Sequence, residues 1–298
     1  MIYLVDASVY VFRAYYSMPP DMVDGDGNPV HALYGFARFL SDLLEREKPR
    51  YIAVAFDASL STSFRNRIYP AYKANREPAP PDLMLQFARC RQFCERLGIA
   101  WFDSPEFEAD DLIGTLAARM RAEGLRATIV SRDKDLAQLI TPGDVYWDYS
   151  GNIRYHHGEI EGRFGVCPDR YADYLALTGD AVDNIAGVPG VGPKTAAVLM
   201  RAFATLDDLY ARLDVVHDLP LRGAASVVAR LAQHREAAFL ARELTRIRCD
   251  VMLPVTRHQL QRRPPDLAAI EDFCGGNGFG SLLRNQAARL AQGAGAVG

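Results

Sequence analysis

The sequence is short of cysteine and has no long apolar run. Its 298 residues include five cysteines, an odd number without the paired spacing of zinc ligands: Cys90, Cys94, Cys167, Cys249 and Cys274. This pattern argues against a disulfide framework. No stretch of about 18 apolar residues occurs, so no membrane span is expected. The chain enters an apolar segment at once, without a basic leader. We therefore expect no secretory signal and a location in the reducing cytoplasm.

Charge of one sign is not in excess, and we find no internal repeat. The chain has 34 basic and 37 acidic residues, so net charge alone does not indicate a nucleic-acid partner. Hydrophobic residues make up 49% of the sequence, which suits one large α/β unit or two packed domains.

Acidic residues recur in short, separated clusters along the first two-thirds of the chain. They are Asp6, Asp57, Glu108, Asp110, Asp111, Asp133, Asp135, Asp180 and Asp183. Any one of them alone is typical of a solvated surface charge or a helix cap. The set is different, because Asp6, Asp57 and Asp133 each end or closely follow an apolar run, and Glu-x-Asp-Asp and Asp-x-Asp also occur.

The three apolar runs predict buried strands of a mostly parallel sheet flanked by helices. The carboxyl ends of such strands converge on one crevice, where open α/β sheets bind ligands. We therefore expect the acids to meet in space. Carboxylates brought together repel one another and need cations, and their oxygen atoms suit Mg²⁺ or Mn²⁺ beside phosphate. If the nine acids bind metal, the rest of the surface is basic, which fits an enzyme that binds polyanions.

The pattern divides the chain into an α/β unit at 1–163 and a helical domain at 164–290, with a disordered tail at 291–298. In the first unit, hydrophobic spacing predicts three helices and a late hairpin: Leu33–Arg46, Leu83–Leu97 with Asp82 as its N-cap, Glu108–Arg121, and strands at 145–149 and 153–155. The basic and aromatic stretch 60–82 is expected to stand outside the sheet.

A glycine-rich segment, Gly187–Thr195, lies between two predicted helices, Asp169–Leu177 and Thr195–Phe203. It fails the test for a phosphate-binding P-loop, since Lys194 follows Pro193 and no apolar strand precedes it. Two interpretations remain. It is either a tight corner that uses glycine for positive φ, or a helix–hairpin–helix at about 170–203 whose backbone N–H groups bind a DNA phosphate. Asp180 and Asp183 just upstream favour the second.

Together these motifs resemble the 5′ nuclease (flap endonuclease) family, most closely the 5′→3′ exonuclease domain of bacterial DNA polymerase I. The matching segments run in order over nearly the whole chain: Leu4–Asp6 through Phe12–Tyr15, Ala55–Asp57, Tyr72–Arg76, Phe107–Asp111, Arg132–Leu136, Leu177–Asn184 and the glycine segment, with likeness continuing from His234 to about residue 285. The resemblance implies a PIN-like core with a helical arch at about 60–100.

The resemblance also implies roles for individual residues. Asp6, Asp57, Glu108, Asp110 and Asp111 would hold a first metal ion, and Asp133, Asp135, Asp180 and Asp183 a second. Lys73 and Arg76 would act at the scissile phosphate, and Arg13 would contact a nearby phosphate. Gly187, Val188, Gly190, Gly192, Lys194 and Thr195 would hold the downstream duplex, together with a monovalent cation such as K⁺. Tyr72 is a candidate for stacking on an unpaired base, although packing explains it equally well.

The expected activity is metal-dependent hydrolysis of DNA near 5′ ends, flaps or junctions, in replication or repair. RNA-primer/DNA hybrids are possible further substrates, and a monomer is expected. Ala7 follows Asp6 where polymerase-linked relatives usually carry Gly, and the absence of a polymerase domain predicts a free-standing nuclease. Two alternatives are a junction-binding protein with weak or no catalysis and a single-strand ribonuclease. The complete second acidic set argues against the first, and the hairpin and basic arch against the second.

Overall fold

A six-stranded sheet forms the centre of the larger half of the molecule, with strand order β3-β2-β1-β4-β5-β6. The computed structural model describes residues 1–58 and 62–294. The strands are β1 (Ile2–Asp6), β2 (Tyr51–Ala55), β3 (Ala100–Phe102), β4 (Ala127–Val130), β5 (Val145–Asp148) and β6 (Ile153–His156). All neighbours pair in parallel except β5 and β6, which form the predicted antiparallel hairpin. The expected mostly parallel sheet is confirmed.

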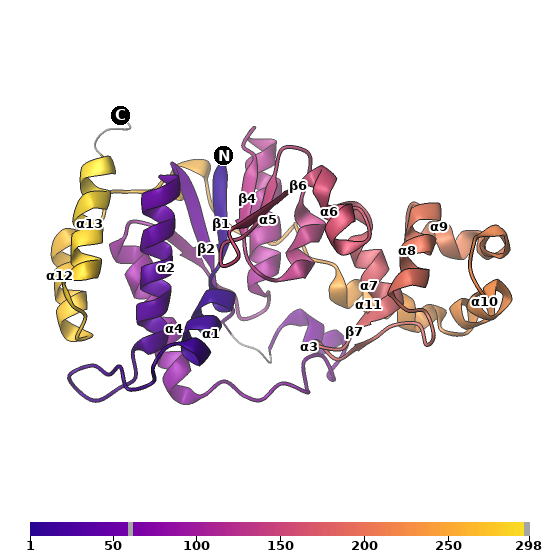
Figure 1. The fold of residues 1–298 in the computed structure, drawn as a ribbon, viewed down its shortest axis with the longest axis horizontal. Helices are drawn as coiled ribbons and strands as arrows, with labels where there is room; N and C mark the ends of the chain where they lie inside the picture. Colours follow the sequence, from indigo (N-terminus) through magenta and orange to yellow (C-terminus); the bar gives the residue numbers. More distant parts are fainter. Residues whose placement is uncertain (59–61, 295–298) are drawn as a thin grey trace.

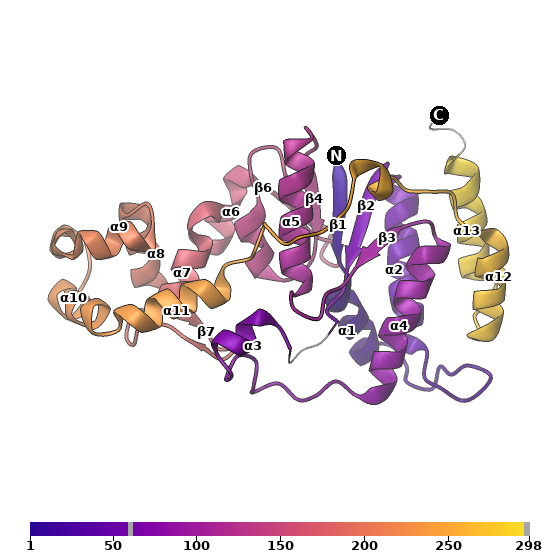
Figure 2. The same ribbon diagram turned by 180° about the vertical axis from the view of Figure 1, so that it is seen from behind.

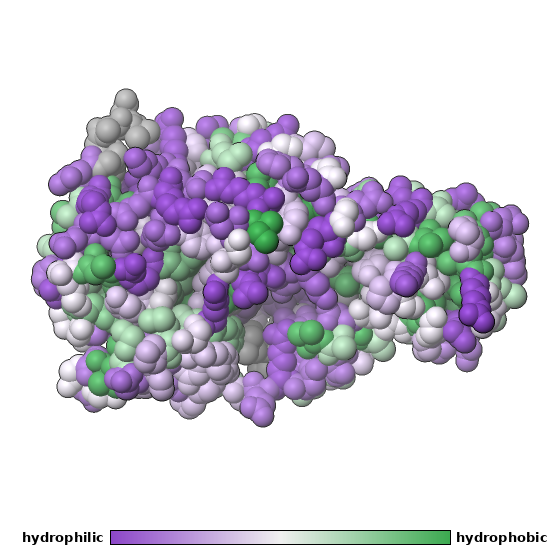
Figure 3. Space-filling view, in the orientation of Figure 1, coloured by the Kyte–Doolittle hydropathy of each residue, from purple (hydrophilic) through white to green (hydrophobic). Residues whose placement is uncertain are grey.

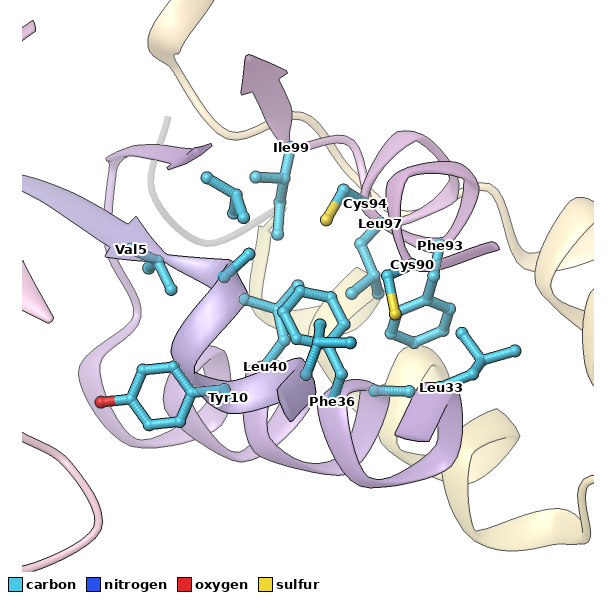
Figure 4. Packing of buried hydrophobic residues seen from close by; sticks show 14 of the residues in the cluster. Val5, Tyr10, Leu33, Phe36, Leu40, Cys90, Phe93, Cys94, Leu97 and Ile99 are labelled. Atoms are coloured by element: carbon cyan, nitrogen blue, oxygen red, sulfur yellow. The ribbon is translucent and has the colours of Figure 1, made fainter. Parts of the chain in front are cut away.

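Helices cover both faces of this sheet because its central strands are apolar on both sides. Val5 of β1 joins a core with α1 (Ala7–Ser17), α2 (His31–Glu47) and α4 (Pro81–Arg96), part of which Figure 4 shows. Ile2 and Leu4 face the opposite core, formed with α5 (Ala109–Ala122), the 3₁₀ helix η1 (Lys134–Leu139) and α6 (His157–Phe164). This alternation is what the two-residue period of a strand requires.

The predicted arch at about 60–100 is wrong in its second half. Leu83, Phe87 and Phe93 of α4 are buried in the sheet core, so this helix cannot stand away from the sheet. Of the predicted arch, α3 (Phe64–Ile68) and the irregular stretch to residue 80 run between the two halves of the molecule (Figure 1). Residues 59–61 of the predicted arch lie outside the described residues. Asp82 is not the N-cap of α4 either. Pro80 takes that position, and Asp82 lies in the first turn, where it accepts a hydrogen bond from the Tyr15 hydroxyl.

The second half of the molecule is a helical extension with its own apolar core. It comprises η2 (Pro168–Arg170), α7 (Tyr171–Thr178), the two-stranded ribbon β7 (Gly179–Asp180) and β8 (Ile185–Ala186), α8 (Pro193–Ala202), α9 (Leu206–Ala211), η3 (Leu213–Asp218), α10 (Ala224–Gln233) and α11 (Arg235–Thr245). The expected pair of helices around the glycine segment is present as α7 and α8. The first of them starts later than predicted, because Pro168–Arg170 form a 3₁₀ turn.

The chain then returns to the sheet, which corrects the predicted extent of the helical domain. An extended stretch with the short η4 (Arg257–Leu260) runs back across the molecule (Figure 2) and forms a bridge between Gln261 and Tyr51, the first residue of β2. The last helices, α12 (Leu267–Gly276) and α13 (Ser281–Ala294), pack on α2 and α4 rather than on the helical extension. Residues 291–294 of the predicted disordered tail are helical, and 295–298 lie outside the described residues. Within the part that the structure describes, no helix is both long and apolar enough to span a bilayer.

Candidate active site

Acids from three elements meet at the carboxyl edge of the sheet. Asp6 ends β1, Asp57 follows β2, and Glu108 is the N-cap of α5, with Asp110 in the first turn of that helix. The Asp57 carboxylate accepts a hydrogen bond from the Ala109 backbone N–H at 2.9 Å, which ties β2 to α5. The parallel strands and the helix N-terminus thus bring together side chains up to about a hundred residues apart.

The negative charges of this first group of acids repel one another. Burial and then the charge of Asp57 raise the pKa of Asp6 to about 7. Burial and then the charge of Asp133 raise the pKa of Asp110 well above its usual range. Glu108 differs from Asp6 and Asp110. Burial opposes its ionisation, but the charges of Lys73 and Arg65 outweigh this effect and hold its pKa below the ordinary value. Asp6 and Asp110 therefore lack enough positive charge nearby.

The second group combines acids of the sheet half with acids of the helical extension. Asp133 follows β4, Asp135 lies on η1, Asp180 ends β7, and Asp183 lies in the loop between β7 and β8. Burial and then the charges of Asp133 and Asp180 raise the pKa of Asp135 well above its usual range. Lys134 partly offsets this cluster, since its Nζ lies 3.3 Å from the Asp180 carboxylate. The surface is hollowed between the two halves of the molecule, and hydrophilic residues border the hollow (Figure 3).

The donor chemistry of both groups fits hard divalent cations. One buried carboxylate oxygen, Oδ1 of Asp135, has no hydrogen-bond partner. Burial, and then repulsion from neighbouring acids, raises the pKa of Asp6, Asp110 and Asp133. As the side chains stand, no three His, Cys, Asp or Glu residues in 1–58 and 62–294 converge closely enough to hold an ion. Carboxylates of like charge repel one another and stay apart. Bound divalent cations would attract them and draw their oxygens together.

Asp111 does not share this environment, which corrects its assignment to the first metal position. It is fully buried, and both of its oxygens bind the Arg65 guanidinium, at 2.6 and 2.8 Å. The backbone N–H groups of Arg248 and Glu108 also donate to the Asp111 carboxylate. Four donors saturate it, so Asp111 serves as the partner of a buried arginine and has no oxygen free for a metal ion.

Lys73 lies beside the acids of both groups. Its Nζ lies 2.9 Å from the Glu108 carboxylate and 3.8 Å from that of Asp183. Arg76 also pairs with Asp183. Burial opposes protonation of Lys73, but the charges of Glu108 and Asp183 outweigh it and raise its pKa, so the ammonium stays charged.

Tyr72 does not have the exposed ring that base stacking requires. The residue is 3% exposed, and its ring packs in the core of the helical extension. Its hydroxyl bridges Glu108 and Asp183, at 3.0 and 3.1 Å. The alternative of stacking on an unpaired base is therefore wrong. Tyr72 instead lies between an acid of the first group and an acid of the second and forms hydrogen bonds with both.

The predicted DNA contacts lie on either side of the acids. Arg13 is on the exposed side of α1, where it lines a cavity of about 300 Å³ with Tyr10, Phe39 and Tyr149. In the glycine segment, Gly190 has a positive φ of 76°, and Lys194 is exposed in the first turn of α8, next to Thr195. Gly187 and Gly192 flank this turn. The Val188 side chain is buried in the helical core, so only its backbone is available to a ligand.

Sequence reasoning missed three residues that hold the site together. Ser131 is fully buried, donates its hydroxyl to Asp6 at 2.7 Å and accepts from the Asp133 backbone N–H. Ser8 accepts from the Asp57 backbone N–H at 3.0 Å. Arg65 is the buried partner of Asp111. A signal existed for Ser131, which directly follows the third apolar run. Arg65 stands among other basic residues and had no signal that marked it as buried.

A sheet edge crowded with carboxylates, next to basic residues from a crossing segment, is typical of the class of α/β enzymes that cleave phosphodiester bonds with divalent metal ions. Comparison with family models agrees. The model described as 5′-3′ exonuclease, N-terminal resolvase-like domain, matches residues 1–165. The model described as 5′-3′ exonuclease, C-terminal SAM fold, matches residues 166–268. The chain belongs to the 5′-3′ exonuclease family.

Two kinds of relative share this family. The DNA polymerase I of Rhizobium leguminosarum is 36% identical over 293 residues, which are 96% of this chain but 28% of the relative. The 5′-3′ exonuclease of Buchnera aphidicola subsp. Schizaphis graminum is 34% identical over 260 residues, which are 87% of this chain and 90% of the relative. The chain thus spans about a third or less of the polymerases it matches and nearly the whole of the separate exonuclease.

Solved structures share the fold at low sequence identity. The T5 5′-exonuclease with bound zinc is 18% identical, with a TM-score of 0.66 over 98% of this chain and 99% of that one. The catalytic core of Rad2 in complex with DNA substrate is 15% identical, with a TM-score of 0.62 over 97% and 90%. Because both likenesses cover nearly all of the chain, the helical extension and the two returning helices belong to the shared fold.

Proposed function

We propose that this protein is a divalent-metal-dependent 5′→3′ exonuclease and structure-selective flap endonuclease of DNA. The observation that carries the proposal is the crowding of eight carboxylates from both halves of the molecule around too few cationic groups. Membership of the 5′-3′ exonuclease family supports it. The T5 flap endonuclease, a structural neighbour, has been crystallised with DNA and metal ions.

The eight acids would hold two ions, which we propose to be Mg²⁺ or Mn²⁺ because all the donors are carboxylate oxygens. Asp6, Asp57, Glu108 and Asp110 would hold one, and Asp133, Asp135, Asp180 and Asp183 the other. When bound, the metal supplies an acidified water and neutralises charge on the phosphate, so a histidine base is not needed.

The remaining groups of the site act on the phosphate and on the acids themselves. Lys73 and Arg76 carry positive charge next to both acidic groups, where it would stabilise the additional negative charge of the transition state. Tyr72 and Ser131 orient individual carboxylates by hydrogen bonds. The backbone N–H groups of the glycine segment and Lys194 would hold phosphates of the duplex.

Further aspects of the proposal concern ligands and location. A monovalent cation such as K⁺ would bind at the glycine segment, and RNA-primer/DNA hybrids would be cut alongside DNA flaps. We propose a monomer that acts in the cytoplasm during replication or repair. The cytoplasmic location is supported by five cysteines that are all unpaired, three of them buried.

Cleavage of an end-labelled duplex with a 5′ single-strand flap tests the proposal. We expect cleavage near the junction with Mg²⁺ or Mn²⁺, leaving a 5′-phosphate and a 3′-hydroxyl, and no cleavage with EDTA. A blunt duplex and a single strand of the same sequence serve as matched substrates. Tight binding without any metal-dependent product would instead establish a junction-binding protein and sink the enzyme proposal.

A further inference from the structure

The segment that carries Lys73 and Arg76 is held by the loop between β7 and β8, which carries Asp183 and directly follows Asp180. The Lys73 backbone N–H donates to the Asp183 carbonyl at 3.0 Å. The side-chain amide of Asn184 donates to the Ala71 carbonyl at 2.7 Å, and that of Asn75 donates to the Ala181 carbonyl at 3.2 Å. These bonds join two segments more than a hundred residues apart, one on each side of the acids.

Both segments adopt unusual backbone conformations at this contact. Lys73 has φ of 55° and Asn184 has φ of 57°, in the left-handed region that residues other than glycine seldom adopt. Asparagine tolerates this region better than most residues, whereas lysine gains nothing from it. The surrounding contacts must therefore hold Lys73 in place, and the bonds across the loop supply them.

The loop is in turn rigidly connected to the glycine segment. It joins β7 to β8, and a Cβ atom at Gly187 would lie 2.3 to 2.5 Å from the backbone of Leu177–Gly179. The Val188 backbone N–H donates to the Leu177 carbonyl at 2.9 Å. Backbone therefore packs directly against backbone between the end of α7 and the glycine segment. A duplex held at the glycine segment would be placed relative to Ala71–Lys73 through these contacts.

We propose that Asn184 is a positioning residue: the hydrogen bond from its side-chain amide to the Ala71 carbonyl sets where Lys73 lies relative to a duplex held at the glycine segment. Asn184 touches neither substrate nor metal in this role. Its side chain anchors the crossing segment to the unit that binds duplex. This inference rests on the proposed nuclease function and goes beyond it, since it assigns a role to a residue outside the acidic and basic groups of the site.

The test is Asn184→Gly, which permits the left-handed backbone conformation and removes the side chain with its amide. The matched control is Asn152→Gly. Asn152 has φ of 51° and also makes one side-chain hydrogen bond, to Arg46 at 3.0 Å, but it lies in the β5–β6 turn, outside the site. Asn184 is exposed, so both variants should fold, and equal thermal midpoints would verify this.

With a 5′-flap duplex and saturating Mg²⁺, we expect Asn184→Gly to lower the single-turnover rate about fivefold, the effect of one lost hydrogen bond, with duplex affinity unchanged. Asn152→Gly should match the wild type. The Lys73→Ala, Asn184→Gly double variant should be no slower than Lys73→Ala. Hydrogen exchange should also be faster at the Lys73 amide in Asn184→Gly, without any metal present.

Three outcomes overturn the inference: an unchanged rate in Asn184→Gly, rate losses that multiply in the double variant, or unchanged exchange at Lys73. Failure of the proposed function is distinct from all three, because in that case the wild-type protein itself does not cleave the flap.

Discussion

At the scale of single residues, the site depends on how each charge is compensated. Two aspartates next to each other in sequence have opposite environments. Asp111 is saturated by four donors, whereas Asp110 has a raised pKa among other acids. The residue type and its position in a motif therefore do not decide its role. The direction in which the helix turns each side chain does, because residues one apart on a helix do not face the same neighbours.

Lys73→Ala is expected to slow flap cleavage about a hundredfold, because it removes a positive charge placed where the transition state gains negative charge. Duplex binding should change little, since the glycine segment is untouched. Single-turnover cleavage and a binding assay at matched salt check this. Lys48→Ala is the control, since Lys48 is exposed at the C-terminal end of α2. Unchanged turnover in Lys73→Ala would remove this residue from the site.

Arg65→Ala is expected to lower the free energy of unfolding by about 3 kcal/mol, because it leaves Asp111 buried and unpaired. Arg67→Ala, two residues along the same helix, should change it by no more than about 0.5 kcal/mol, since the Arg67 side chain is 64% exposed. Urea unfolding of both variants measures the difference. Equal losses would show that the Arg65–Asp111 pair contributes nothing specific to folding.

Asp144 predicts a pH dependence of stability. It is fully buried and accepts hydrogen bonds from the Ala127 backbone, Thr141 and Arg121. Burial opposes its ionisation, but the bond from the Ala127 N–H and those from Thr141 outweigh it and lower its pKa. A lowered folded-state pKa adds stability above the unfolded pKa of about 4, and this stability is lost as pH falls through the folded-state pKa.

Asp144→Asn should therefore unfold more easily than the wild type by about 2 kcal/mol at pH 7. The difference should shrink as the pH falls below about 4, where the wild-type carboxylate becomes protonated. Urea titrations across this range measure both proteins. A difference in the free energy of unfolding that stays constant with pH would show that ionisation of Asp144 does not contribute to stability.

At the scale of elements, close contact between backbones positions the acids of the helical extension. The ribbon of β7 and β8 has only two residues in each strand, yet it determines how the loop with Asp180 and Asp183 faces the sheet. It can do so because glycine at 179 and 187 lets two backbones touch.

Gly187→Ala should destabilise the protein by about 2 kcal/mol or more, because its Cβ would overlap the backbone at the end of α7. Gly162→Ala, in α6 with no atom within 4 Å of the added Cβ, should instead stabilise by about 0.5 kcal/mol through helix propensity. Thermal unfolding of both variants shows whether the two changes in stability have opposite signs. If Gly187→Ala is as stable as the wild type, the ribbon is not tightly packed.

At the scale of the whole molecule, the site exists only where two halves meet. Asp133 and Asp135 come from the sheet half, and Asp180 and Asp183 from the helical extension. Two segments connect the extension to the sheet half: Ala71–Lys73, and the extended stretch that returns to β2 at Tyr51.

Divalent cations should stabilise the whole protein, because they relieve repulsion among the clustered carboxylates and bind only the folded site. At about a hundred times the dissociation constant, the gain is about 2.7 kcal/mol, which corresponds to a rise of several degrees in the thermal midpoint. Mg²⁺, Mn²⁺ and Ca²⁺ should each raise the thermal midpoint more than NaCl does at equal ionic strength. Equal midpoints in all of these salts would contradict a metal site at the acids.

The sequence by itself determined the mostly parallel sheet, the positions of most helices and the acids that meet at its edge. Apolar runs have to be buried, and the ends of parallel strands meet at one edge. It did not determine that α4 belongs to the core, that α12 and α13 return to the sheet, or that Tyr72 is buried. Those outcomes depend on which apolar faces find each other, and local patterns do not contain that information.

The tertiary structure alone also showed that Asp111 differs from the eight acids proposed to bind metal. It likewise showed that Asn184 forms a hydrogen bond with Ala71. Both depend on partners more than 40 residues away, Arg65 for the first and the crossing segment for the second. A carboxylate or an amide has the same identity in the sequence whether it is saturated or free. Only the positions of distant donors and acceptors decide which groups remain available to metal and phosphate.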